Sequence, residues 1–193
     1  MLKPEQASEA ERIGRQQVRS ILAFLQREVP GFEKALIAGI AQRVGVRETR
    51  RIVGRHTLTA EDILSQRRFG DAVALGSGPM DVHDPGGTGI TLFMPPAPFE
   101  IPMRCLLPQQ VEGLIVTGRA ISATQEANGG ARHMATAMAL GQAAGAMALV
   151  AARDANSTLA IPPAAVQALL REDDAAVTVQ EALARSPNAT MTQ

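Results

Sequence analysis

The stretch VEGLIVTGRAISATQEANGGARHMATAMALGQAAGAMALVAA, residues 111–152, decides the fold that we expect. It opens with an apolar run, residues 114–117, that ends at Gly118 and is typical of a strand buried on both faces of a parallel sheet. Two glycines, residues 129–130, then interrupt the chain just before Arg132, where a long helix rich in Ala, Gly and Met is predicted to begin. A strand, a loop and a helix in this order predict an α/β fold.

This arrangement is also how α/β folds build a site for negative charge. The unpaired N–H groups and the dipole of a helix that begins near Arg132 favour an anion. A flavin that takes up hydride gains such charge at one edge of its ring, and Arg119 and Arg132 would add fixed positive charge for a phosphate or a ring carbonyl. The alternative is that Gly118 only permits a tight turn and the helix only packs, since such units occur throughout α/β proteins.

The composition narrows the class of protein. Lys plus Arg and Asp plus Glu number 19 each, so no net charge favours nucleic acid or an anionic membrane, and we expect neither as a partner. The single Cys105 excludes an internal disulfide framework and fits a reducing compartment. The first residues are polar where a signal peptide needs an apolar core, so we expect a cytoplasmic protein.

Residues 134–152 need comparison with a membrane helix, because only Thr136 and Gln142 in this stretch are polar. The stretch is about as long as a membrane helix needs to be. Most of its residues are Ala and Gly, which gain little free energy on transfer to lipid. A helix buried in a soluble α/β domain is therefore the better interpretation.

The other segments carry shorter signals. Helices are predicted over residues 9–28, over 32–45 as the second arm of a helical hairpin, at 59–62 after a Thr cap, and over 163–171. Extended segments are predicted at 71–75 and 99–103, on either side of a loop rich in Gly and Pro over residues 76–98. Residues 186–193 are expected to form a frayed tail.

The most basic part of the chain, residues 43–55, has two interpretations. Its arginines are Arg43, Arg47, Arg50, Arg51 and Arg55. They would bind an anionic substrate or phosphate, or form a solvated set paired with nearby acids. A DNA-binding alternative takes residues 36–55 as a helix-turn-helix with an Arg-rich recognition helix, although the balanced net charge counts against it.

Asp81, His83 and Asp84 cluster within the glycine-rich loop. A His between two acids is typical of a general acid–base or a metal ligand. We predict no metal site, because all three residues lie on one short segment, and a loop His without a catalytic role is the alternative. Cys105 has no base near it in sequence and is expected to be buried packing.

Several blocks of the chain, in order, resemble the C-terminal half of the FAD-dependent oxidoreductase family that is distantly related to fumarate reductase flavoproteins. They are VPGFEKA (29–35), GVRETRRIVGRHTLTAEDIL (45–64), MDVHD (80–84), EIPMRCLLPQQVEGLIVTGRAISAT (100–124) and ARHMATAMALGQAAGAMAL (131–149). The resemblance covers about residues 5–170. It implies FAD as cofactor and hydride transfer between a small organic substrate and the flavin N5 atom.

The resemblance also implies roles for single residues. Those along the ribityl–phosphate region of the flavin are Gly118, Arg119, Ser122 and Ala123. Those in the turn that faces the isoalloxazine ring are Arg132, His133 and Met134. The implied catalytic residues, close to the flavin or the substrate, are Arg47 and His83. The family tends to carry His where this chain has Gln125, so no proton transfer is expected there.

Enzymes of this family begin with a βαβ unit that carries G-x-G-x-x-G and holds the ADP half of FAD. Nothing in this sequence matches it, since Gly76-Ser77-Gly78 lacks the third glycine. We therefore expect a truncated or split enzyme, with a possible partner chain that supplies this unit. A non-catalytic structural subunit is the alternative.

The expected fold class is α/β, as the C-terminal part of a two-domain FAD-binding fold. It would contain the last strand and helix of the flavin domain together with a helical and loop part of the substrate domain. The predicted segments are a helical hairpin with part of the substrate-covering region (1–98), the end of the flavin domain (99–154), and a linker, small helix and flexible tail (155–193).

Overall fold

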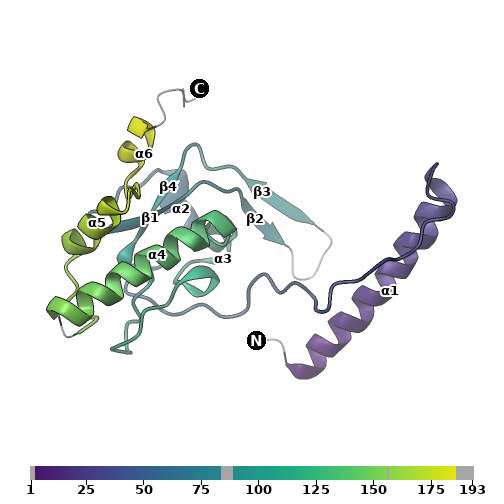
Figure 1. Ribbon diagram of the computed structural model, residues 1–193, viewed down its shortest axis with the longest axis horizontal. Coiled ribbons are helices and arrows are strands. Elements are labelled where there is room, and N and C mark those ends of the chain that lie inside the picture. The colour runs from purple at the N-terminus through teal and green to yellow at the C-terminus, as the bar shows by residue number, and fades with distance from the viewer. Residues whose placement is uncertain (1–2, 84–88, 156, 186–193) are drawn as a thin grey trace. The chain divides into compact units, whose positions relative to one another are not determined.

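The computed structural model describes residues 3–83, 89–155 and 157–185, and the side chains of 154 and 155 are not described. The chain forms two compact units, Met1–Thr49 and Arg50–Gln193, and each is described by itself. Helices and two small antiparallel sheets make up its secondary structure (Figure 1), which is compatible with the predicted α/β class. The sheets of the described residues contain no parallel pair of strands, and the assignment of segments to two domains of an enzyme stays a prediction.

The first unit contains one long helix, α1 (Pro4–Glu28). The predicted helix over residues 9–28 is confirmed, but it begins earlier, because Pro4 suits the first turn of a helix and Gln6 Oε1 accepts a hydrogen bond of 3.0 Å from the Lys3 amide. Ser8 is therefore inside the helix rather than at its cap, and its hydroxyl donates to the Pro4 carbonyl.

The second helix predicted over residues 32–45 is wrong. After Glu28 the next helix begins at Ala60, and residues 36–45 are extended or irregular. Glycines at 31, 39 and 45 weaken a helix here, and the segment bonds to α1 instead. Gln26 Nε2 donates to the Ala35 carbonyl at 2.8 Å, and the Val44 amide donates to Glu11 Oε1 at 2.5 Å. The helix-turn-helix prediction over residues 36–55 is wrong for the same reason.

The core of the second unit lies around the pair β1 (Ala72–Gly76) and β4 (Phe99–Pro102), which confirms both predicted extended segments. Helix α4 (Met134–Val150) packs against β1, and α5 (Pro163–Glu172), also as predicted, packs against both (Figure 1). α4 begins beside β2 and α3 and ends on the side of α5. The buried side chains of these two helices include Leu140, Met147, Val166 and Leu170. A last helix, α6 (Val179–Arg185), was not predicted.

An extended segment, residues 52–58, runs between two others and connects them by backbone hydrogen bonds. On one side it bonds to residues 104–109, and on the other to residues 120–124. Gly54 is required within it, because a Cβ atom there would lie 2.6 Å from the Cβ of Ser122. The helix α2 (Ala60–Leu64) follows directly, capped by Thr59 as predicted.

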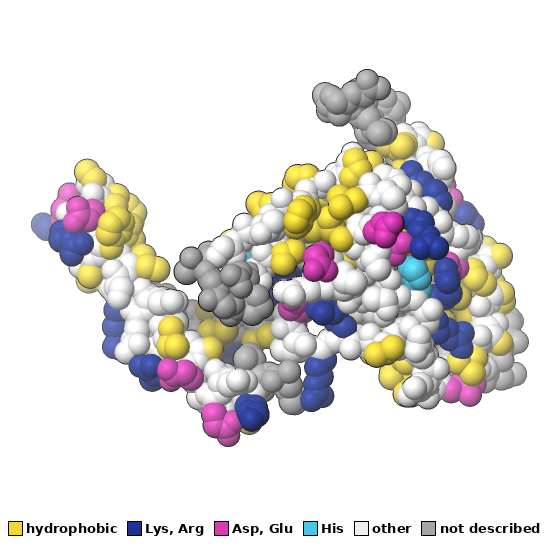
Figure 2. All heavy atoms as spheres, turned by 180° about the vertical axis from the view of Figure 1, so that it is seen from behind, with side chains coloured by type: hydrophobic (Ala, Val, Ile, Leu, Met, Phe, Trp, Pro, Cys, Tyr) yellow, Lys and Arg dark blue, Asp and Glu magenta, His cyan; other side chains and the backbone are white. Residues whose placement is uncertain are grey.

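The loop predicted over residues 76–98 contains a hairpin, so this prediction is wrong in part. β2 (Met80–His83) pairs antiparallel with β3 (Ile90–Phe93), and α3 (Gln125–Ala131) packs against β2. Only Met80 of β2 is fully buried, while all four residues of β3 are exposed. Hydrophobic side chains gather on the surface of this unit (Figure 2), and the exposed ones include Ile90, Leu92, Phe93 and Met94.

Two details of the stretch 111–152 differ from the prediction. Residues 114–117 form no strand and are partly exposed, because no parallel neighbour in the described chain covers them; Val116 makes one backbone bond, to Leu106 at 2.9 Å. Gly129 and Gly130 do not break the chain but lie inside α3, where β2 approaches closely. The break falls at Arg132 and His133, so the long helix α4 begins at Met134.

Residues Met134–Arg153 form the one described helix long and apolar enough to cross a membrane by length and composition, a test that core helices of soluble proteins also pass. One face of α4 packs on β1 and α5, but only 28% of its most apolar window is buried, and Met134 and Met138 are exposed. The prediction of a buried helix therefore holds for one face of α4 only.

Candidate functional site

Gly118 forms the turn that follows the extended segment 114–117. Its φ of +68° lies in the left-handed region that favours glycine, and it opens a short 3₁₀ helix, Gly118–Ala120. This 3₁₀ helix packs against α3 and α4. Apart from Gly118 and its two chain neighbours, no atom of the described residues lies within 4 Å of the position that a Cβ of Gly118 would take, so the backbone is open on that side.

Ser122 and Ala123 lie behind this turn, where the chain passes residues 52–58. Ser122 is 1% exposed, and its hydroxyl oxygen lies 3.0 Å from Oγ1 of Thr57. The Ser122 carbonyl accepts from the Leu58 amide at 3.1 Å, and Leu58 forms a parallel bridge with Ala123. These bonds fix the backbone of Ser122 and Ala123, which follows the Gly118 turn. The side chain of Arg119, within the turn, is exposed.

The junction between α3 and α4 holds Arg132, His133 and Met134. His133 is the N-cap residue of α4, but its side chain makes no capping hydrogen bond to the first N–H groups of the helix. The His133 ring instead places Nε2 at 2.9 Å from the Pro79 carbonyl. Met134 is 85% exposed at the start of the helix. The start of α4 therefore has no cap from the side chain of its N-cap residue, and it carries the positive end of the helix dipole.

β2 is attached to this junction by an ion pair. Arg132 Nη2 lies 2.5 Å from Oδ1 of Asp81 and 3.1 Å from the Asp81 carbonyl, and the Arg132 side chain is only 9% exposed. His83 lies on the same face of β2, with Nε2 at 3.4 Å from Oδ2 of Asp81. Asp84, the third member of the predicted cluster, lies outside the described residues.

The structure thus brings together two groups of the predicted site residues. One group is the turn of Gly118 with Ser122 and Ala123, and the other is His83 with the α3–α4 junction. Arg47 belongs to the first unit, where it is exposed. Among the described residues, no group of three or more His, Cys, Asp or Glu side chains is placed to hold a metal ion.

A buried charged cluster around Asp62 was missed by the sequence interpretation. Its carboxylate accepts from His56 Nε2 at 3.0 Å, from the Thr59 amide at 3.1 Å and from Arg67 at 2.9 Å. Burial alone raises the pKa of Asp62, but the hydrogen bonds from Arg67, Thr59 and His56 outweigh it and hold this pKa below its usual value. The Thr59 cap with an acid three residues later is the signal that predicts part of this cluster.

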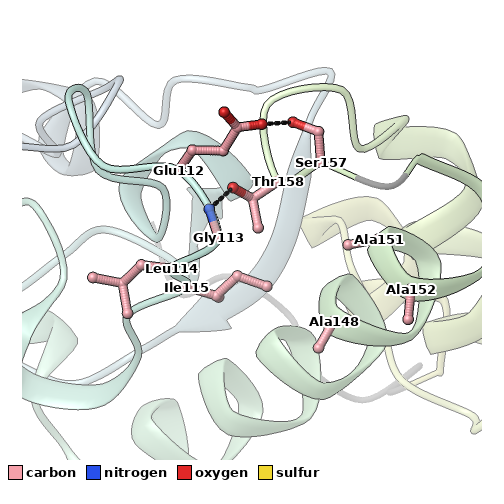
Figure 3. Close-up of a pocket in the computed structure, with 9 residues that line it drawn as sticks. All are labelled: Glu112, Gly113, Leu114, Ile115, Ala148, Ala151, Ala152, Ser157 and Thr158. Carbon is pink, nitrogen blue, oxygen red and sulfur yellow. Dashed lines mark hydrogen bonds between the residues drawn. The ribbon is translucent and has the colours of Figure 1, made fainter.

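A cavity of about 730 Å³ lies at the other end of α4 (Figure 3). It is lined by residues around Leu114 and Ile115, by the end of α4, and by Ser157 and Thr158. The Gly113 amide donates to Thr158 Oγ1 at 2.9 Å, and Ser157 donates to Glu112, so the polar groups at its rim are bonded to one another (Figure 3). This cavity is separate from the α3–α4 junction, because it adjoins the last turn of α4 rather than the first.

A turn with an open backbone and a helix start without a side-chain cap, on elements that contact each other, are typical of proteins that bind a phosphate-bearing cofactor. Residues 1–170 match the family model described as FAD dependent oxidoreductase. The chain therefore belongs to this family of flavin-dependent oxidoreductases, and the cofactor of the family is FAD. No curated protein and no solved structure matches the chain.

The described residues fit a flavin on two observations. The first N–H groups of α4 are uncapped, so an anionic or polar ring edge can accept from them. The Gly118 turn leaves space where any other residue would place a Cβ, so a ligand can approach the backbone.

Proposed function

We propose that this chain contributes the C-terminal part of an enzyme that transfers hydride between a small organic substrate and FAD. When bound, FAD supplies the acceptor or donor of hydride at its N5 atom. The observation that carries the proposal is the uncapped start of α4 at His133 and Met134, in a chain that matches the FAD-dependent family over residues 1–170.

The start of α4 would stabilise the negative charge that a flavin gains when it is reduced. The dipole of a helix places about half a positive charge at its first turn. The N–H groups there are fixed by the helix, so they need no rearrangement when charge develops. The backbone of His133 and Met134 would face the ring, in agreement with the roles that the resemblance implies.

The turn at Gly118 would lie along the ribityl–phosphate part of the cofactor. Its open backbone permits close approach, Arg119 would add positive charge, and Ser122 and Ala123 would hold the turn in place through residues 57 and 58. His83 would serve as a general acid or base, since it lies on β2 beside the same junction with its side chain 37% exposed.

We also propose that high affinity for FAD requires a G-x-G-x-x-G βαβ unit in addition to the residues of this chain. The sequence contains no such motif, and the ADP half of FAD depends on it in dinucleotide-binding folds. The unit would come from another segment or from a partner chain. The chain by itself is then expected to bind FAD weakly.

A titration of the ¹⁵N-labelled full chain with FAD up to millimolar concentration, followed by NMR, tests the site. We expect saturable shifts at the amides of Gly118 and Met134, with an affinity too weak for stoichiometric binding. Shifts confined to residues 157–158 would place the ligand in the cavity of Figure 3 and contradict the proposal. Tight stoichiometric binding would contradict the need for a further unit.

Two glycine variants supply a matched control. Gly118 and Gly113 both have positive φ, +68° and +74°, and both are open where a Cβ would be added. Ala at either position introduces the same kind of backbone strain. Only Gly118→Ala should weaken the FAD-dependent shifts, because Gly113 lines the cavity at the far end of α4.

A further inference from the structure

We propose that Asp81 is a positioning residue for the flavin site, which acts through Arg132 to hold the start of α4 in place. This inference rests on the flavin site proposed above, and it assigns the Arg132 guanidinium to β2 rather than to the cofactor. We call the contact of residues 78–81 with residues 129–133 the β2 clamp. It joins β2 and the segment before it to the end of α3 and the N-cap of α4.

The first part of the β2 clamp is the bond between Asp81 and Arg132. Arg132 donates both to the Asp81 carboxylate at 2.5 Å and to the Asp81 carbonyl at 3.1 Å, so it recognises the side chain and the backbone of one residue. Its side chain is 9% exposed, and a cation that well covered keeps its position only with a partner. Because Arg132 is the residue between α3 and α4, this bond fixes where one helix ends and the next begins.

The second part is the contact between Pro79 and His133. A carbonyl can only accept, so His133 Nε2 carries the hydrogen and donates it to the Pro79 oxygen at 2.9 Å. The ring is thereby turned away from the N–H groups that an N-cap side chain would otherwise occupy, and it makes no capping bond. A Cβ on Gly78 would lie 2.1 Å from this ring, so the segment before β2 fits closely against His133.

The third part is the close fit between the backbone of β2 and the glycines of α3. A Cβ on Gly129 would lie 2.8 Å from the Asp81 carbonyl oxygen and 3.0 Å from its amide nitrogen. A Cβ on Gly130 would lie 3.1 Å from Cγ of Met80, which is fully buried. These glycines therefore allow α3 to pack closely enough against β2 for Arg132 to bond to Asp81.

Together the three contacts leave the start of α4 open and fixed in direction. A helix start that moves would present its N–H groups to a ligand only part of the time, and binding would be weakened by that fraction. The β2 clamp removes this loss, while the side chain of its N-cap residue His133 makes no capping bond to α4.

Amide hydrogen exchange of the full chain without cofactor tests the clamp itself. We expect Asp81→Ala and Gly129→Ala to speed exchange at the hydrogen-bonded amides of Arg132 and Ala137 by at least about tenfold, since each variant removes or displaces a contact to a charged group. Asp81→Asn retains an acceptor for Arg132 and should fall between these variants and the unsubstituted chain. Exchange in β1 and β4 should not change, which shows that the variants are folded.

Asp174→Asn is the matched control. It removes an exposed ion pair, of 3.1 Å, between Asp174 and Arg185, which belong to the same unit but lie away from the α3–α4 junction. It should leave exchange at the amides of Arg132 and Ala137 unchanged. Unchanged exchange in both Asp81→Ala and Gly129→Ala would overturn the clamp, whether or not the chain binds a flavin.

The NMR titration with FAD then tests the positioning role on the same variants. We expect the shifts of the Met134 amide to weaken in the order unsubstituted chain, Asp81→Asn, Asp81→Ala. Shifts of equal size and midpoint in all of them would overturn the positioning role. An absence of shifts in the unsubstituted chain would count against the proposed flavin site alone, because the exchange experiment decides the clamp without any flavin.

Discussion

The imidazole Nε2 of His56 lies 3.0 Å from Oδ2 of Asp62, inside the unit that contains the candidate flavin site. Asp62 is 6% exposed, and it also accepts from Thr59 and Arg67. The His56 ring meets the Phe69 ring edge-on, with centroids 5.2 Å apart, and Arg67 lies over the same ring at 5.3 Å. One carboxylate thus holds the cap of α2, an arginine and the segment 52–58 together.

Asp62→Asn should destabilise the chain by about 2 kcal/mol at neutral pH, because three donors lose a charged acceptor. The pKa of Asp62 is lowered in the folded state, so its stabilising effect is present above the unfolded pKa of about 3.9 and is lost as pH falls through the folded value. Urea unfolding of the unsubstituted chain and of Asp62→Asn, from pH 7 down to pH 3, measures the difference in their free energies of unfolding. A difference that grows as the pH falls would contradict the assignment.

Gly76→Ala should destabilise the chain by about 1–3 kcal/mol. The added Cβ would lie 2.3 Å from Cζ of Phe99, a residue of the core that is 1% exposed. Gly70→Ala is the control, since nothing lies within 4 Å of a Cβ there. Urea unfolding should place Gly70→Ala within about 0.5 kcal/mol of the original chain. If the ring is the cause, Phe99→Leu should cost less in the Gly76→Ala background than alone.

The secondary structure was predictable where a local signal and the packing agree. Thr59 caps α2, Pro163 begins α5, and the apolar residues 72–75 form β1, each with a signal within the segment itself. The apolar spacing of Phe32, Leu36 and Ile40 is helical as well, yet this segment forms a turn and irregular backbone that bonds to α1. Periodicity fails there because contacts with another element, together with interrupting glycines, outweigh a weak propensity.

The candidate site was predictable in its members but not in its geometry. A tight turn at Gly118 was among the interpretations of the sequence, and the structure shows a turn there with a positive φ, which glycine adopts readily. Gly129 and Gly130 were interpreted as a chain break, whereas they serve close approach of β2 inside a helix. Whether a glycine ends a helix or admits a neighbour depends on residues distant in sequence, here Met80 and Asp81, so no local pattern distinguishes the two.

Cys105 should resist alkylation in the folded chain. Burial raises the pKa of its thiol to about 12, so at pH 8 only about one thiol in ten thousand is a thiolate, and the side chain is fully covered. Mass spectrometry after treatment with iodoacetamide should show almost no modification in buffer and complete modification in urea. Because this is the single Cys of the sequence, the degree of labelling reports directly on opening of the core around β4. Rapid labelling in buffer at a rate close to that in urea would contradict a buried thiol.

Glu100 should anchor α6 to the core. This residue of β4 is 2% exposed; its carboxylate accepts from the Phe69 amide at 2.9 Å and from the Val179 amide at 3.1 Å, and Arg68 lies 3.4 Å away. Glu100→Ala leaves two buried N–H groups without an acceptor, which should cost about 3 kcal/mol. Since Val179 begins α6, amide exchange over residues 179–185 should accelerate more than exchange in α5.

Glu100→Gln retains one oxygen acceptor and should lose less stability, and Glu172→Ala, on the exposed end of α5, should change neither measurement. Equal acceleration of α5 and α6 in Glu100→Ala would show global loosening instead of release of α6, and would contradict this anchoring role.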